Sequence, residues 1–299
     1  MLKKEFRSGF VSLVGRPNAG KSTLLNYMIG QKIAITSDKP QTTRNRIVGV
    51  ITNDEWQMVL LDTPGIHKPK DKLGDSMVKV ALNTLNEVDV VYYLIDGSVP
   101  FGGGDAFIIQ KLKEVKTPVF LLLNKIDLLD KNKLLPMIDF YRAKRDWQEI
   151  VPVSALKGEN INSLLEATLG HMQKGPQYYP EDALTDQPER VLIAELVREK
   201  VIETTREEIP HSVAVIVEHM ESRTDDLVYI GVSIYVERDS QKGILIGKNG
   251  DKLKVIGSRA RLDIEKLLGN RVFLELWVKV KTDWRNRDSL LNELGYRQK

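Results

Sequence analysis

Six short apolar segments recur along the first 154 residues, and amphipathic stretches separate most of them. These segments cover residues 10–14, 47–51, 58–62, 88–96, 119–124 and 150–154. Strands that alternate with helices form a mostly parallel sheet with helices on both faces. The second and third segments are joined by a polar stretch that is too short for a crossover, so they form a hairpin. The sequence therefore predicts an α/β domain with a mostly parallel six-stranded sheet and one antiparallel edge strand.

A chain of 299 residues exceeds the roughly 100 to 200 residues of an ordinary single domain. Residues 175–189 (GPQYYPEDALTDQPE) are rich in proline and acidic residues, which is typical of a linker. We predict a first domain at 1–178, a linker at 179–190 and a second domain at 191–299. The second domain reads as α-β-β-α-(α)-β, an α+β order, with elements at 190–206, 212–222, 227–238, 250–268 and 272–282 and a short final helix at 290–296.

The composition excludes several classes of chemistry. The chain has no cysteine, which removes disulfides, thiolate metal sites and cysteine nucleophiles and favours a reducing cytoplasm. The first ten residues are basic but lack the apolar stretch of a secretory signal. The apolar runs are far shorter than the ~20 residues of a membrane-spanning helix. We expect a cytoplasmic protein.

Charge is unevenly distributed along the chain. The net charge is +3, yet residues 242–287 contain 12 Lys and Arg against 5 Asp and Glu, a net +7, which leaves −4 for the rest. A basic segment on a mildly acidic chain suggests a polyanionic partner, either nucleic acid or an anionic membrane surface. An ordinary solvated basic face is the alternative.

Residues 15–22 (GRPNAGKS) match the GxxxxGK[ST] pattern between a predicted strand and a predicted helix. In such a loop the main-chain N–H groups hold phosphates, Lys21 reaches the outer phosphates and the Ser22 hydroxyl binds Mg²⁺. The strand before and the helix after make a chance match improbable. A second glycine run, at 102–104, has no GK[ST] after it, and we interpret it as a helix start without phosphate chemistry.

Three further motifs follow other predicted strands: DTPG at 62–65, NKID at 124–127 and SAL at 154–156. Asp62 can reach a Mg²⁺-bound water, and the Gly65 N–H can contact a γ-phosphate. The Asp127 carboxylate can accept two hydrogen bonds from guanine, whereas adenine lacks those donors, so GTP or GDP is favoured over ATP. The predicted nucleotide-binding residues are Gly15, Arg16, Pro17, Asn18, Ala19, Gly20, Lys21, Ser22, Thr23, Asp62, Thr63, Pro64, Gly65, Asn124, Lys125, Asp127, Ser154, Ala155 and Leu156.

Residues 31–46 (QKIAITSDKPQTTRNR) are polar and weakly periodic, so we interpret them as a mobile loop. Thr43, or else Thr42, can bind Mg²⁺ only while the γ-phosphate is present, which would make the loop a switch. The predicted metal ligands are Ser22, Thr43 and Asp62. An ordinary surface loop is the alternative.

The residue after DTPG is Ile66, which cannot orient an attacking water as a glutamine would. A polar switch-loop residue, His67 or a monovalent cation could substitute. We rank first a potassium ion held by Asn18, standing where an arginine finger acts in other enzymes. The candidate catalytic residues are Lys21, Thr43, Gly65 and Asn18.

In the second domain, residues 243–250 (GILIGKNG) precede a basic helix. Two glycines around Lys248 and Asn249 let the sugar-phosphate chain of a single RNA strand lie against the main chain, with bases on the adjacent apolar groove. A simple helix-start turn is the alternative, and for Trp284 core packing and RNA stacking are both open. The predicted RNA-binding residues are Ile244, Ile246, Gly247, Lys248, Asn249, Gly250, Lys252, Lys254, Arg259, Lys281, Trp284 and Arg285.

The set GRPNAGKS, QTTRNR, DTPGIH, NKID, SAL and IGKNG resembles the bacterial Era GTPases over essentially the full length. The resemblance implies a P-loop GTPase domain followed by a type II KH domain. It also implies a monomeric enzyme that hydrolyses GTP, binds the 3′ end region of small-subunit ribosomal RNA, assists 30S subunit maturation and contacts the inner face of the plasma membrane peripherally. One alternative is a membrane-surface GTPase switch whose basic domain binds anionic lipid. A double-GTPase ribosome factor is disfavoured because no second GxxxxGKS occurs.

Overall fold

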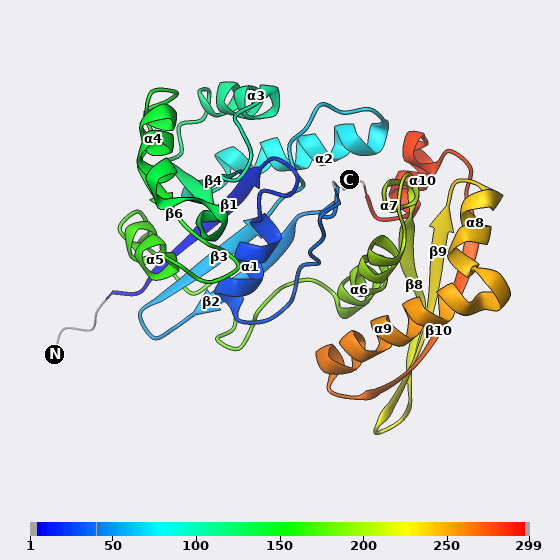
Figure 1. Cartoon of the computed structure of the whole chain (residues 1–299). Helices are drawn as coiled ribbons and strands as arrows, with labels where there is room; N and C mark the ends of the chain where they lie inside the picture. The colour runs from blue at the N-terminus through cyan, green and yellow to red at the C-terminus, as the bar shows by residue number, and fades with distance from the viewer. Residues whose placement is uncertain (1–4, 40, 297–299) are drawn as a thin grey trace. The chain divides into compact units, whose positions relative to one another are not determined.

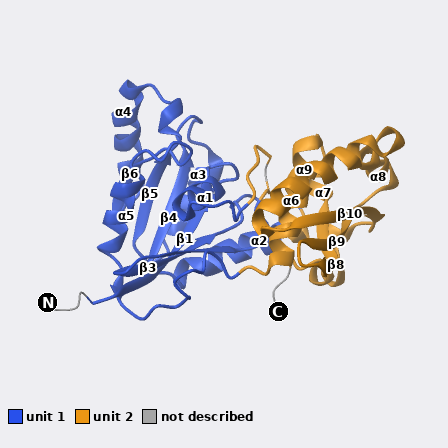
Figure 2. Cartoon of the chain, turned by 90° about the horizontal axis from the view of Figure 1, so that it is seen from below, with its two compact units in different colours: residues 1–34, 43–70, 74–186 blue, residues 35–42, 71–73, 187–299 orange. Residues whose placement is uncertain are grey.

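The computed structural model describes residues 5–39 and 41–296. They divide into two compact units, which Figure 2 shows in different colours. The first unit comprises residues up to 34, 43–70 and 74–186, and the second comprises 35–42, 71–73 and 187–299. The division at residue 186 lies inside the predicted linker. The assignment of 35–42 and 71–73 to the second unit goes beyond the prediction. Within the described ranges, no helix is long and apolar enough to cross a membrane.

The first unit is built on a sheet of seven strands (Figure 1). The strand order is β2-β3-β1-β4-β5-β6, and β7 pairs with β1. Its strands are β1 Arg7–Gly15, β2 Ile47–Thr52, β3 Trp56–Asp62, β4 Val90–Asp96, β5 Val119–Asn124, β6 Glu149–Pro152 and β7 Gln173–Lys174. β2 and β3 are antiparallel, as predicted, and the pairs from β3 to β6 are parallel. The antiparallel β7 has only two residues, too few to show a periodic pattern.

Helices cover both faces of this sheet. They are α1 Lys21–Ile29, α2 Lys72–Asn83, α3 Gly103–Leu112, α4 Lys131–Arg142 and α5 Ile161–Leu169, with 3-10 helices at Thr84–Asn86 and Ile126–Leu128. Successive side chains of a strand point to opposite faces. Tyr92 of β4 therefore lies in one core with Leu164 of α5, and its neighbour Tyr93 lies in the other core with Ile108 of α3. Because both faces are covered, the carboxyl ends of the strands remain for a ligand.

The second unit contains a three-stranded sheet of order β10-β9-β8. Its elements are α6 Glu189–Thr204, α7 Ile209–Ser212, β8 Ala214–Thr224, β9 Leu227–Val236, α8 Asp239–Ile246, the 3-10 helix Lys248–Gly250, α9 Asp251–Leu268, β10 Arg271–Val280, the 3-10 helix Trp284–Asn286 and α10 Asp288–Glu293. β8 is antiparallel to β9, and β10 is parallel to β9 after a crossover through α8 and α9. Val197 of α6, Ile264 of α9 and Val232 of β9 share one core. The predicted order of elements is confirmed.

Buried charged groups join residues 35–42 to α6 within the second unit. Arg198, with 0% of its surface exposed, donates hydrogen bonds to the Thr42 carbonyl oxygen and to the Glu195 carboxylate. Glu199 is buried beside it and accepts a hydrogen bond from the Thr36 main-chain N–H at 3.0 Å. The segment that ends one residue before Thr43 is therefore held by two side chains of one helix.

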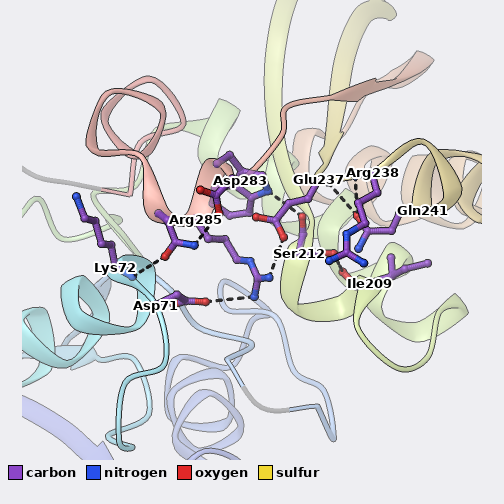
Figure 3. A network of polar contacts seen from close by, with 11 residues as sticks. Asp71, Lys72, Ile209, Ser212, Glu237, Arg238, Gln241, Asp283 and Arg285 are labelled. Atoms are coloured by element: carbon purple, nitrogen blue, oxygen red, sulfur yellow. Dashed lines mark hydrogen bonds and ion pairs between the residues drawn. The ribbon is translucent and has the colours of Figure 1, made fainter.

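A second polar network holds Asp71 and Lys72 (Figure 3). The Arg285 guanidinium pairs with Asp71 at 3.2 Å and with Glu237 at 2.8 Å, and Lys72 pairs with Asp288 at 2.9 Å. Arg285 is thus committed to two carboxylates inside the unit. Its position argues against the predicted contact with RNA.

Candidate nucleotide and RNA sites

The phosphate loop connects the end of β1 to the start of α1. Its main chain turns through left-handed conformations, with φ of 65° at Asn18 and 97° at Gly20. A Cβ atom at Gly20 would lie 2.1 Å from Nδ2 of Asn124, so only glycine fits there. Lys21 is buried at the first turn of α1, and its Nζ donates to the Arg16 carbonyl oxygen at 3.1 Å. Main-chain N–H groups and a lysine at a helix N-terminus are the features that hold phosphates.

The three side chains predicted to bind Mg²⁺ meet beside this loop. Ser22 Oγ donates to Asp62 Oδ2 at 2.6 Å and lies 2.9 Å from Thr43 Oγ1, which is 3.2 Å from the same carboxylate oxygen. Asp62 Oδ1 is buried and has no hydrogen-bond partner among the described residues. Mg²⁺ prefers oxygen ligands. The residues therefore fit this ion, with Ser22 and Thr43 as hydroxyl ligands and Asp62 within reach of a metal-bound water.

Electrostatics favour a charged ligand at the same place. Burial raises the pKa of Asp62, and the Lys21 charge and two hydroxyl hydrogen bonds oppose that rise. Burial also lowers the pKa of Lys21, and Asp62 opposes that fall. The protein by itself therefore stabilises neither charge fully. Bound phosphate groups would stabilise the positive charge of Lys21, and a divalent cation would stabilise the negative charge of Asp62.

The structure distinguishes Thr43 from its neighbour Thr42. Thr43 is buried with the metal-binding set, whereas Thr42 Oγ1 donates to the Lys39 carbonyl oxygen at 2.7 Å. The Thr42 carbonyl also accepts the hydrogen bond from Arg198. Thr43 is therefore the threonine placed for Mg²⁺.

Asn124 connects three of the predicted motifs. It is 1% exposed at the end of β5, and its Nδ2 donates to the Ala19 carbonyl oxygen at 2.8 Å. Its Oδ1 accepts from the Ala155 main-chain N–H at 2.9 Å. The phosphate loop and the SAL segment are thus fastened to opposite ends of one amide group.

Asp127 lies next to that junction in the 3-10 helix after β5. Its Oδ1 accepts a hydrogen bond from the buried Ser154 hydroxyl at 2.7 Å. Ser154 Oγ in turn accepts from the Lys157 N–H at 3.1 Å. These contacts orient the half-buried carboxylate that we predict to recognise guanine.

Lys125 has a partner that sequence reasoning missed. It adopts φ of 65°, and its Nζ lies 2.5 Å from Asp96 at the end of β4. Burial would raise the pKa of Asp96, but hydrogen bonds from Lys125 and Ser98 outweigh it and hold that pKa below its ordinary value. The available signal was positional, because parallel β4 and β5 place Asp96 beside Asn124.

The predicted RNA loop lies between α8 and α9. Gly247, Asn249 and Gly250 have φ of 75°, 52° and 82°, so the main chain bends sharply here. The side chains of Lys248 and Asn249 are exposed. Four other predicted RNA contacts, Ile244, Ile246, Lys252 and Lys254, lie on the flanking helices, and Arg259 follows further along α9.

The RNA-stacking role considered for Trp284 is wrong. Its side chain is 0% exposed, its Nε1 donates to the Ser212 carbonyl oxygen at 2.9 Å, and its ring stacks on Tyr296. Core packing is therefore the correct alternative. Lys281 is paired with Glu293, so its charge is also partly neutralised within the unit.

Comparison with known proteins finds two family models that match separate parts of the chain. A family model described as 50S ribosome-binding GTPase matches residues 10–125, and a KH domain model matches residues 208–285. A crystal structure of Era with MgGDPNP and nucleotides 1506–1542 of 16S ribosomal RNA is 44% identical, covers 98% of this chain and 100% of its own, and has a TM-score of 0.95. A tyrosine-to-alanine variant of Aquifex aeolicus Era bound to GDP and AlF4⁻ is also 44% identical, with the same coverage and a TM-score of 0.94. The chain belongs to the Era family of GTPases.

In this Era-family GTPase, the residue after DTPG is buried in the core of the first unit. Ile66 is 1% exposed in the core, and its N–H donates to the Gly15 carbonyl oxygen at 2.9 Å. His67 Nδ1 lies 2.9 Å from the Gly65 carbonyl oxygen, which directs the ring to its own loop. Ile66 therefore cannot take the place of a water-orienting glutamine.

We predict that Thr43→Val raises the Mg²⁺ concentration needed for half-maximal GTP hydrolysis by ~10-fold or more, because a hydroxyl ligand is lost. Thr42→Val is the matched control and should change this concentration less than about twofold, since its hydroxyl donates to the Lys39 carbonyl oxygen and not to the metal-binding set. A Mg²⁺ titration of phosphate release checks both. Equal effects of the two substitutions would contradict the assignment of Thr43.

We predict that Asp127→Asn exchanges GTP for xanthosine triphosphate. The asparagine amide would place its N–H groups opposite the N–H groups of guanine, so GTP affinity should fall ~100-fold or more. The same N–H groups can donate to the extra carbonyl of xanthine. Asp130→Asn is the control, because Asp130 caps α4 through the Asn132 N–H and asparagine caps equally well. Calorimetry with both nucleotides checks this, and an Asp127→Asn chain that keeps its GTP affinity would contradict it.

Proposed function

We propose that this chain couples GTP binding and hydrolysis to binding of the 3′ end region of small-subunit ribosomal RNA, and thereby assists maturation of the 30S subunit. The observation that carries the RNA half is the loop of residues 247–250, whose Lys248 and Asn249 side chains are exposed between two glycines. The Era complex that aligns with 98% of this chain holds nucleotides 1506–1542 of 16S ribosomal RNA. A corresponding strand is the expected ligand here.

The chemistry of the loop suits a single strand of RNA. Glycines at 247 and 250 remove side chains where a sugar-phosphate chain would approach. The 18-residue helix α9 begins at Asp251, so its positive end adds to the charge of Lys248. Ile244 and Val255 expose apolar surface on the two flanking helices, and unpaired bases pack on such surface. The loop and its two flanking helices therefore offer a separate contact to the sugar-phosphate chain, to its negative charge and to the bases.

We place this activity in the cytoplasm, in a monomeric chain. The net +7 of residues 242–287 also suits a peripheral contact with the anionic inner face of the plasma membrane. The same basic residues would then serve two polyanions. Lys248→Asp separates these partners, because the RNA strand is expected to lie on the loop that contains Lys248, whereas an anionic lipid surface would be attracted by the basic residues of 242–287 together.

We predict that Lys248→Asp weakens binding of a single-stranded oligoribonucleotide of the rRNA 3′ end by ~10-fold or more at fixed salt. Lys266→Asp makes the same charge change at an exposed position near the other end of α9, and it should change the affinity less than about threefold. Fluorescence anisotropy measures both, with GTP affinity as the folding control.

Vesicles containing anionic lipid provide the contrasting ligand. If Lys248→Asp lost vesicle binding and kept RNA binding, the membrane-surface switch would replace the proposal. Equal losses in Lys248→Asp and Lys266→Asp would indicate a diffuse charge effect and would contradict recognition by the loop.

We also propose that a potassium ion assists hydrolysis through Asn18. This residue is exposed in the phosphate loop at φ of 65°, and an amide oxygen is a suitable ligand for a monovalent cation. The buried Ile66 leaves the position after DTPG without a polar side chain. A bound cation supplies positive charge to the phosphoryl group as its negative charge develops. Asn18 would hold that cation, and Lys21 would contact the outer phosphates.

We predict that GTP turnover in potassium exceeds that in sodium by ~10-fold or more, and that Asn18→Ala removes the difference. The reason is that sodium is smaller and fits the same oxygen ligands less well. Phosphate release is measured for both chains in both salts at equal ionic strength. Equal rates in all four cases would rule out the ion, and a potassium effect that survives Asn18→Ala would rule out this ligand.

A further inference from the structure

The start of α3 contacts the phosphate loop through one ion pair. Arg16 Nη1 lies 2.9 Å from Asp105 Oδ2, and the Asp105 side chain is only 5% exposed. We infer that Asp105 and Gly104 are positioning residues for nucleotide binding, which act by holding Arg16 and so the main chain of the phosphate loop. This role lies in the glycine-rich segment to which the motif pattern assigns no chemistry.

Capping of α3 does not by itself account for Asp105. Its Oδ2 accepts from the Gly102 main-chain N–H at 3.0 Å, which is the ordinary contact of an acidic residue in the first helical turn. The same oxygen also accepts from Arg16, and Oδ1 lies 3.4 Å from the Tyr93 hydroxyl. A capping residue needs one acceptor contact, and on an exposed turn a polar residue would suffice. Here a nearly buried carboxylate is matched to one guanidinium.

The residue that Asp105 holds is itself a junction of the phosphate loop. The Arg16 carbonyl oxygen accepts from Lys21 Nζ at 3.1 Å and from the Ala19 N–H at 3.3 Å. The preceding Gly15 carbonyl accepts from the Ile66 N–H at 2.9 Å. Displacement of the Arg16 side chain would therefore shift the main-chain atoms that shape the loop and contact its lysine.

Gly104 provides the space in which Arg16 lies. A Cβ atom at Gly104 would be 3.1 Å from Nε and 3.3 Å from Cδ of Arg16, both closer than ordinary contact. A Cβ atom at Gly103 would meet nothing within 4 Å. Both glycines belong to the first turn of α3, so alanine raises helix propensity similarly at each. The difference between the two positions isolates the contact with Arg16.

The inference rests on the nucleotide site proposed above. The main-chain N–H groups of such a loop hold the α- and β-phosphates, which GDP and GTP share. Loss of the Asp105–Arg16 contact should therefore lower the affinity for GDP and for GTP by the same factor. It should also raise KM more than it lowers kcat. A change in a switch residue would instead affect GTP more than GDP.

The first experiment removes the charge and keeps the shape. Asp105→Asn retains an acceptor for the Gly102 N–H but loses the carboxylate, and we expect Kd for GDP and for a non-hydrolysable GTP analogue to rise together by ~10-fold. In an Arg16→Ala background the same substitution should add less than about twofold, because its partner is already absent. Asp139→Asn is the control, since it breaks the exposed pair with Arg142 on α4.

The second experiment changes no polar group. Gly104→Ala should raise both Kd values by ~3-fold or more, whereas Gly103→Ala should leave them unchanged. Unaltered nucleotide affinity in both Asp105→Asn and Gly104→Ala, or an undiminished effect of Asp105→Asn without Arg16, would overturn the inference. The unsubstituted chain is the reference: if it failed to bind GDP, the site assignment itself would be wrong, whereas tight binding by every variant would remove only this role.

Discussion

The arrangement of the nucleotide site depends on Asn124, which fastens two loops to the end of a central strand. Its amide nitrogen donates to the carbonyl of Ala19, and its amide oxygen accepts from the N–H of Ala155. Both contacts are buried, and a buried donor or acceptor without a partner costs ~1 to 3 kcal/mol, so neither loop can leave without a penalty. Gly20 allows this close approach, because any side chain there would collide with the amide. The phosphate and base ends of the site are therefore held at a fixed separation by one side chain.

Much of the first unit could be predicted because the signals are local and the topology is regular. Each buried strand is a short apolar run, and parallel strands bring their carboxyl ends to one edge. Ser22 and Asp62 follow two such strands, so their meeting could be foreseen from order alone. Thr43 was less certain, because a loop without periodicity does not show which of two adjacent threonines faces inward. Only the three-dimensional contacts distinguish them.

What could not be predicted involves pairs of side chains from distant segments. Asp96 at the end of β4 pairs with Lys125, and Asp105 in the first turn of α3 pairs with Arg16. Strand order could have placed Asp96 near Lys125, but no periodic pattern shows which side chains form a pair. Trp284 is a case in which the local sequence suggests the wrong environment. Its neighbours in KTDWRNR are polar and basic, which suggests an exposed residue, yet the indole fills a space between Ser212 and Tyr296 and is wholly buried. Tertiary packing overrides local composition at such positions.

The chain path between Thr42 and Thr43 has a thermodynamic consequence. Residues 35–42 belong to the second unit by their packing, whereas Thr43 belongs to the first unit and lies with the metal-binding side chains. One peptide bond joins them, and a trans peptide fixes consecutive Cα atoms at ~3.8 Å. A ligand that fixes Thr43 therefore restricts Thr42, and the contact of Arg198 with Thr42 restricts Thr43 in return. Any free-energy coupling that arises this way must act equally in both directions.

Lys21 and Asp62 make the site dependent on its ligand. Both are buried, burial disfavours both charges, and each is stabilised in part by the other. A phosphate group would supply a counter-charge for Lys21, and a hydrated cation would supply one for Asp62, whose second oxygen has no partner among the described residues. Ser22 and Thr43 now direct their hydroxyl groups at the same carboxylate, although their oxygen atoms are suited to a metal ion. Nucleotide and metal thus relieve, in one binding event, the electrostatic cost that folding leaves at this edge of the sheet.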